Sequence, residues 1–146
     1  MEQIAIVGAG LIGRAWAMVF ARAGHPVRLW DPIAGVSETA LKLIEQSLAD
    51  LAEARLITEA PSVIAARITA APTLAACVHG AQHVQENGPE RVAPKQALFA
   101  ELDALCGPEV VLASSTSGIP ASAFTENLPS RARCLVAHPV NPPYLV

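Results

Sequence analysis

The sequence has 146 residues, of which 10 are Lys or Arg and 13 are Asp or Glu, so its formal net charge is −3. A weakly acidic chain argues against a nucleic-acid-binding protein, because phosphate binding needs a basic surface. With 52% hydrophobic and 16% charged residues the chain is unlike a disordered protein, and its apolar runs are too interrupted for a membrane span. Three widely spaced cysteines fit free thiols in a reducing compartment, which predicts a cytoplasmic protein.

Short apolar runs alternate along the chain with longer segments rich in Ala and Leu, which predicts strands that alternate with helices. The predicted strands are residues 4–7, 27–30, 68–70, 81–85, 110–113 and 134–137. The predicted helices are residues 11–23, 37–55, 59–66 and 94–105. Ser37 and Thr58 are interpreted as the caps of the second and third helices. Strands linked through helices favour a mostly parallel sheet covered on both faces, an α/β fold over residues 1–146.

A glycine-rich turn joins the first predicted strand to the first predicted helix. It matches the pattern G-x-G-x-x-G, and its members are Gly8, Ala9, Gly10, Leu11, Ile12 and Gly13. In a dinucleotide-binding domain the first glycine permits the tight turn, the second lets the backbone approach a pyrophosphate, and the third lets the helix pack closely on the strand. The phosphates then lie at the helix N-terminus, where free N–H groups stabilise them. The sequence therefore predicts a doubly wound, Rossmann-type fold.

An acidic residue ends the second predicted strand. Asp31 lies close to the position from which a carboxylate accepts the hydrogen bond of the adenosine ribose 2′-hydroxyl. A carboxylate there repels a 2′-phosphate, and residues 32–35 contain no Lys or Arg that would offset the repulsion. The predicted cofactor is therefore NAD rather than NADP. The alternative is that the glycines form a plain turn and that Asp31 merely terminates a strand.

Polar residues follow the last two predicted strands, in the stretches 114–118 and 138–141. Open α/β sheets bind ligands beyond the carboxyl ends of their strands, so we expect both stretches to face the cofactor. His138 can take a proton from a substrate alcohol while a hydroxyl of the first stretch orients that alcohol, and a hydride then passes to the nicotinamide. The alternatives are a helix N-cap for the Ser/Thr run and a loop histidine bound to backbone for His138.

No metal site is predicted. Cys77, His79 and His83 are near one another in sequence, but no fourth ligand at a recognised zinc spacing accompanies them. Gly80 also interrupts any helical pairing of the two histidines.

The glycine loop, residues 86–95, residues 115–117 and above all residues 137–144 resemble the 3-hydroxyacyl-CoA dehydrogenase superfamily. Within it they are most similar to the L-gulonate 3-dehydrogenase/lambda-crystallin branch. The resemblance implies the N-terminal NAD domain of a two-domain enzyme. His138 matches the general base of that family, and Ser117 matches the serine that binds substrate and cofactor. Asn141 matches an asparagine near the nicotinamide, and Glu90 and Lys95 match residues that line the cofactor ribose. The implied catalytic residues are His138, Ser117 and Asn141.

Two parts of the family pattern have no counterpart in these 146 residues. The family places a glutamate shortly after the histidine loop, where it orients the imidazole. A C-terminal helical domain closes over the substrate and forms a homodimer. We therefore expect this chain alone to be catalytically incomplete, with both parts beyond residue 146.

The segment 32–67 bears on the substrate. Acyl-CoA members of the family carry basic residues there that bind the CoA phosphates, whereas this chain has three cations against five acids. An acidic segment is a poor anion site, which favours a small 3-hydroxy acid of the L-gulonate kind. One alternative is a 3-hydroxyacyl-CoA or 3-hydroxybutyryl-CoA dehydrogenase of fatty acid metabolism, and another is a non-catalytic NAD(H)-binding structural protein.

Overall fold

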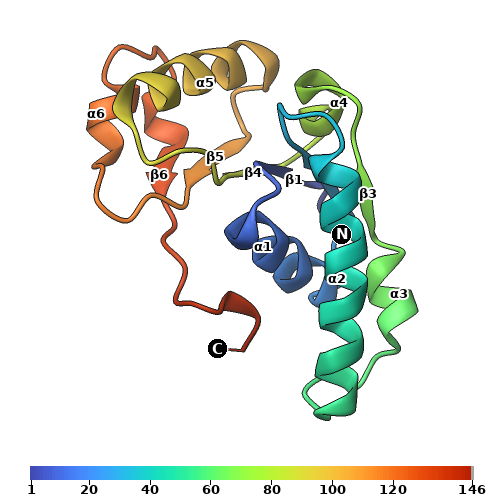
Figure 1. Cartoon of the computed structure of the whole chain (residues 1–146). Helices are drawn as coiled ribbons and strands as arrows, with labels where there is room; N and C mark the ends of the chain where they lie inside the picture. The colour runs from blue at the N-terminus through green and yellow to red at the C-terminus, as the bar shows by residue number, and fades with distance from the viewer. Residues whose placement is uncertain (146) are drawn as a thin grey trace.

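The strands of this chain form one six-stranded parallel sheet. The computed structural model describes residues 1–145, and the strand order is β3-β2-β1-β4-β5-β6 (Figure 1). The strands are β1 Ile4–Val7, β2 Val27–Trp30, β3 Ile68–Ala70, β4 His83–Glu86, β5 Val111–Ser114 and β6 Cys134–Val136. All five neighbouring pairs are parallel, so the predicted doubly wound fold is confirmed. The carboxyl ends of the strands consequently meet at one edge of the sheet.

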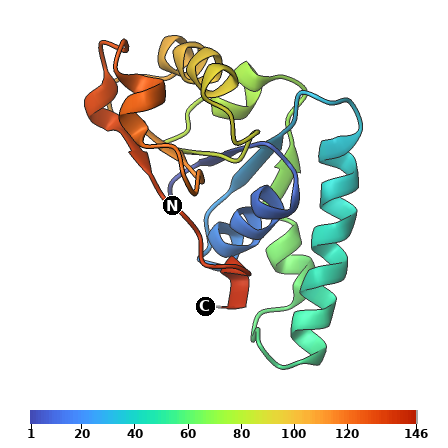
Figure 2. The same ribbon diagram turned by 60° about the vertical axis from the view of Figure 1, so that its left-hand side comes forward.

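Helices cover both faces of the sheet, as Figure 2 shows from a second direction. They are α1 Leu11–Arg22, α2 Val36–Glu53, α3 Pro61–Ala65, α4 Leu74–Val78, α5 Val92–Leu105 and α6 Ala121–Thr125. Two 3₁₀ turns, Arg131–Arg133 and Pro143–Leu145, flank the last strand and end the described chain. The second turn returns to α1, where Arg22 donates a hydrogen bond to the carbonyl oxygen of Tyr144.

The central strand explains why the fold has two hydrophobic cores. Alternate residues of β1 point to opposite faces, so that Ile4 and Ile6 belong to the core beneath α1, α2 and α3. Ala5 and Val7 belong to the core beneath α4, α5 and α6. All four residues are buried, which is why the strand is apolar throughout instead of alternating with polar residues.

Several predicted helix boundaries were wrong. Helix α2 begins at Val36 after Gly35, so Ser37 is a buried residue of its first turn and not its cap. Helix α3 begins at Pro61, whose missing N–H costs nothing in a first turn, and Thr58 lies before the cap position. Helix α5 begins two residues earlier than predicted, at Val92.

Two helices were not predicted. Helices α4 and α6 have only five residues each, too few to show a helical repeat of apolar residues. Thr73 does cap α4, because its hydroxyl accepts a hydrogen bond from the backbone N–H of Ala76 at 3.1 Å. Within residues 1–145 no helix combines the length and hydrophobicity needed to cross a membrane.

Candidate functional site

A crevice of about 290 Å³ opens at the carboxyl ends of β4, β5 and β6, beside the start of α1. It is lined by Ile12, Asn87, Gly88, Glu90, Lys95, Ser115, Thr116, Ser117, His138, Pro139 and Asn141. Six residues predicted from the sequence therefore meet in one place, namely Ile12, Glu90, Lys95, Ser117, His138 and Asn141. They come from four separate stretches of the chain, which the parallel sheet gathers at one edge.

The glycine turn beside this crevice leaves no room for side chains at two positions. Gly8 has a φ of +92°, and a Cβ on it would lie 2.9 Å from the carbonyl oxygen of Asn87. A Cβ on Gly13 would overlap the carbonyl oxygen of Gly8, so α1 can approach β1 only with glycine there. Gly10, in contrast, has open space around its Cβ position, and Leu11 is exposed. Gly10 also lines a second hollow of about 270 Å³ with Ala9.

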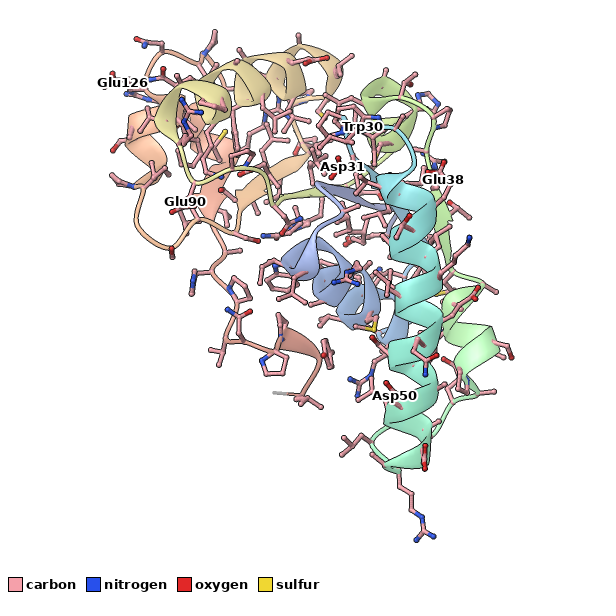
Figure 3. The ribbon with its side chains drawn as sticks, viewed as in Figure 1. Trp30, Asp31, Glu38, Asp50, Glu90 and Glu126 are labelled. Carbon is pink, nitrogen blue, oxygen red and sulfur yellow. The ribbon has the colours of Figure 1, made fainter. Side chains whose placement is uncertain are left out.

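Asp31 lies on the other side of this turn. Its carboxylate accepts hydrogen bonds from the backbone N–H groups of Ala9, at 2.9 Å, and Ile33, at 3.0 Å. A third hollow, of about 450 Å³, adjoins Asp31 and Trp30. In Figure 3, Asp31 and Glu90 lie on opposite sides of the start of α1. A ligand that touches both Asp31 and His138 must therefore be long and pass over the glycine turn, as a dinucleotide does.

Glu90 holds the loop that carries Ser117. Its Oε1 accepts hydrogen bonds from the backbone N–H groups of Ser117 and Gly118, both at 3.0 Å, and from the hydroxyl of Thr116. The hydrogen bond from Thr116, together with these backbone donors, lowers the pKa of Glu90 below its usual value. The carboxylate is thus ionised at neutral pH. Glu90 and Ser117 were predicted separately, and the structure brings them into direct contact.

Lys95 and Glu86 form a buried ion pair in the wall of the crevice. The Lys95 side chain is only 2% exposed, and its Nζ lies 2.9 Å from each carboxylate oxygen of the fully buried Glu86. Glu86 also accepts hydrogen bonds from the Ser114 hydroxyl and the Gly88 N–H. The ammonium that the sequence assigned to the cofactor ribose is thus already bound to a carboxylate. Sequence reasoning gave Glu86 no role, although an acid that ends a buried strand needs a partner.

His138 and Asn141 follow the edge strand β6 and are exposed to the crevice, whereas Pro139 between them is buried. The strand pairing continues one residue past β6, because the N–H of Ala137 donates to the carbonyl of Ser114 at 2.9 Å. This hydrogen bond fixes the backbone immediately before His138. The exposed imidazole is therefore presented from an ordered backbone at the mouth of the crevice.

Cys77, His79 and His83, which were considered as metal ligands, lie in three different surroundings. Cys77 is buried where α4 packs on β1 and β2, and burial raises the pKa of its thiol to about 12. His79 is exposed, and His83 donates or accepts a hydrogen bond with Gln85. In residues 1–145 no three His, Cys, Asp or Glu side chains gather as metal ligands would.

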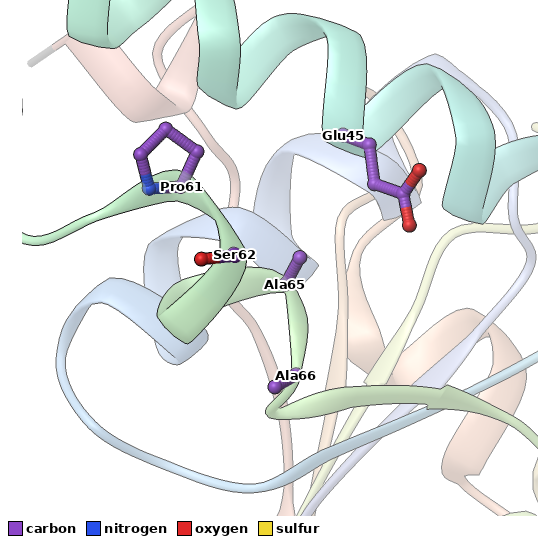
Figure 4. Close-up of a pocket in the computed structure, with 5 residues that line it drawn as sticks. All are labelled: Glu45, Pro61, Ser62, Ala65 and Ala66. Carbon is purple, nitrogen blue, oxygen red and sulfur yellow. The ribbon is translucent and has the colours of Figure 1, made fainter.

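A further hollow of about 420 Å³ lies between α2 and α3 (Figure 4). It is lined by Glu45, Pro61, Ser62, Ala65 and Ala66. Helix α3 precedes β3, so this hollow is near the amino ends of the strands, opposite to the glycine turn. Its walls are mostly small and apolar, and they offer a ligand few polar groups.

Comparison with known proteins assigns the family. Residues 3–146 match the family described as 3-hydroxyacyl-CoA dehydrogenase, NAD binding domain. The chain belongs to this family. The match confirms the resemblance read from the sequence and the prediction of NAD as the cofactor of this 3-hydroxyacyl-CoA dehydrogenase domain.

Individual relatives show which members of the family this NAD-binding domain is similar to. The human lambda-crystallin homolog is 39% identical over 98% of this chain and 46% of that protein. L-carnitine dehydrogenase from Streptomyces coelicolor is 38% identical over 100% of this chain and 45% of that protein. The crystal structure of 3-hydroxybutyryl-CoA dehydrogenase from Escherichia coli matches with a TM-score of 0.90 at 29% identity, over 97% of this chain and 30% of that one. The chain spans about half the length of the curated relatives it matches.

Two substitutions in the glycine turn should separate packing from cofactor binding. Gly13→Ala forces a methyl group onto the Gly8 carbonyl, and we expect it to lower the free energy of unfolding by about 3 kcal/mol. Gly10→Ala meets no protein atom, so stability should change by less than about 1 kcal/mol, while affinity for NADH falls about tenfold or more. Chemical denaturation and calorimetric titration measure the two effects. Equal loss of stability in both variants would contradict the geometry.

Removing the charge of Glu86 should leave Lys95 as an unpaired buried cation. We expect Glu86→Gln to lower the free energy of unfolding by about 3–5 kcal/mol, measured by denaturant titration. The double variant Glu86→Gln with Lys95→Met should recover part of that loss, because no buried charge remains. Glu59→Gln, which breaks the surface ion pair with Arg67, is the matched control and should have little effect. Equal effects at Glu59 and Glu86 would refute the assigned importance of burial.

Proposed function

We propose that this chain binds NAD and supplies the acid–base residues for the oxidation of a 3-hydroxy acid to the 3-keto acid. The observation that carries the proposal is the presence of His138 and Ser117 in one crevice, across the glycine turn from Asp31. A dinucleotide held by Asp31 at its adenosine end would have its other end beside the imidazole and the hydroxyl. Bound NAD supplies the hydride acceptor for this reaction.

Separate residues of the chain take the proton, orient the substrate and contact the cofactor. His138 takes the proton of the substrate hydroxyl, and Ser117 donates a hydrogen bond that orients that hydroxyl. Glu90 holds Ser117 in place, because its carboxylate accepts a hydrogen bond from the backbone N–H of Ser117. Asn141, on the same wall as His138, is assigned to the nicotinamide end of the cofactor.

Charge around α2 and α3 supports a small substrate rather than a CoA thioester. Residues 32–67 contain five acids and three cations, and one of those cations, Arg67, already pairs with Glu59. Few free cations remain there for the phosphates of CoA. A relative at 38% identity is an L-carnitine dehydrogenase, and L-carnitine is itself a small 3-hydroxy acid. We therefore propose a small 3-hydroxy acid such as L-gulonate or L-carnitine.

A CoA thioester is the second candidate, favoured by the close fit to 3-hydroxybutyryl-CoA dehydrogenase at a TM-score of 0.90. A non-catalytic role is the third, suggested by the name of the lambda-crystallin relatives. The joint presence of His138 and Ser117 supports catalysis over that third role, because neither residue lies near the adenosine end of the site.

Calorimetric titration of this chain with NADH and with NADPH tests the cofactor assignment. We expect NADH to bind at least about tenfold more tightly, because Asp31 repels the additional phosphate. Asp31→Ser should narrow that difference by weakening NADH and strengthening NADPH. Equal affinities in the unchanged chain, or no binding of either cofactor, would contradict the assignment.

Replacement of His138 tests the catalytic assignment, in a preparation of the protein that oxidises substrate at a measurable rate. We expect His138→Gln to lower kcat by about 10²–10⁴-fold while leaving NADH affinity unchanged. His79→Gln, which changes an exposed histidine just after α4, should leave both values unchanged. The readout is NADH formation with L-gulonate, L-carnitine and 3-hydroxybutyryl-CoA. A preference for the thioester would favour the second candidate, and full activity of His138→Gln would overturn the role of the imidazole.

A further inference from the structure

A buried amide lies beneath the crevice and belongs to none of the residues assigned above. Gln85, in β4, is 0% exposed and its side chain bonds in three directions. Its Nε2 lies 2.8 Å from the hydroxyl of Ser115 and 3.3 Å from the carbonyl oxygen of Ala137. Its Oε1 lies 3.1 Å from Nε2 of His83. The side chain thus reaches from β4 past the end of β5 to the backbone that precedes His138.

The donors and acceptors of this network are fixed by one carbonyl. The oxygen of Ala137 can only accept, so the nitrogen of the Gln85 amide must face it. Oε1 then faces His83, which must donate from Nε2. Burial lowers the pKa of His83, which keeps the ring neutral with one N–H to donate. The amide orientation and the histidine tautomer are therefore determined together.

Ser115 connects the same network to the helix that follows the glycine turn. Its hydroxyl oxygen accepts hydrogen bonds from Gln85 and from the indole N–H of Trp16, the latter at 2.9 Å. Its hydrogen is then left for the amide oxygen of Asn87, at 2.7 Å. Trp16 lies in α1 and stacks on Phe20, with ring centroids 5.6 Å apart. One hydroxyl thus joins α1, β4 and the loop that carries Ser117.

We propose that Gln85 is a positioning residue that sets the distance between the His138 backbone, the Ser117 loop and α1. This inference rests on the proposed function, since it assigns the geometry of the same site. β6 has three residues at the edge of the sheet, and it pairs with β5 on one side. The Gln85 side chain adds a second attachment, to Ala137, from a strand that is not its neighbour.

An apolar residue of similar size would fill the same volume without the desolvation cost of an amide. A packing role therefore leaves the amide unexplained, whereas a positioning role requires it. The direct consequence falls on the nicotinamide end of the cofactor, because the residues that Gln85 holds line that end and not the adenosine end.

The test compares NADH with ADP-ribose, which lacks the nicotinamide. In Gln85→Met we expect calorimetry to show NADH affinity reduced about tenfold, with ADP-ribose affinity changed less than about twofold. Gln96→Met is the matched control, because Gln96 also donates its amide to a carbonyl, that of Ala123, but outside the crevice. It should leave both affinities unchanged. The indole N–H resonance of Trp16 should shift in Gln85→Met and stay in place in Gln96→Met.

Trp16→Phe provides a second route if Gln85→Met does not fold. It keeps the stacking on Phe20, removes the donor to Ser115 and identifies the Trp16 resonance by its loss. It should also weaken NADH selectively, by several-fold. An unchanged ratio of NADH affinity to ADP-ribose affinity, whether both affinities are retained or both fall equally, would overturn the positioning role. A wild-type chain that binds neither ligand would instead overturn the proposed function on which the inference rests.

Discussion

Glu86 carries a carboxylate to the fully buried end of β4, in the wall of the crevice, and the elements around it must supply donors to that charge. A buried carboxylate is tolerable only with partners, and here Lys95, the Ser114 hydroxyl and the Gly88 N–H all bond to it. These partners come from α5, from β5 and from the loop after β4. The one charge therefore joins three elements around the end of β4.

A site residue could be predicted from the sequence where its position follows from the residues next to it in the chain. The glycine turn, Asp31 and His138 each follow an apolar strand, so their position at the ligand-binding edge could be predicted from chain order and parallel topology. The strands at 68–70 and 81–85 also exist, although β4 is shifted by two residues at its start. Gln85 was missed because its partners are distant in sequence: it bonds to Ala137, 52 residues away. Glu86 was missed because its partner Lys95, nine residues on, reaches it only through the way α5 packs on the sheet.

Trp16 shows the same limitation in another form. An apolar helix face predicts a core tryptophan, and Trp16 does pack on the core beneath α1. Its indole N–H is nevertheless bonded to Ser115, 99 residues along the chain. Periodicity reports which face of a helix is buried and says nothing of where a single polar atom on that face is directed. The short helices α4 and α6 were not predicted for a related reason, since neither is long enough to show a periodic pattern of apolar residues.

Cys77 has a use that follows from its burial between α4 and the sheet. Its thiol points at the carbonyl oxygens of Ile6 and Arg28, and with a pKa of about 12 it is almost never a thiolate in the folded chain. Cys106 and Cys134 are partly exposed and more open to alkylation. Slow labelling of this buried thiol would therefore report transient separation of α4 from the two central strands. A bound dinucleotide, by favouring the fully folded domain, would slow that labelling.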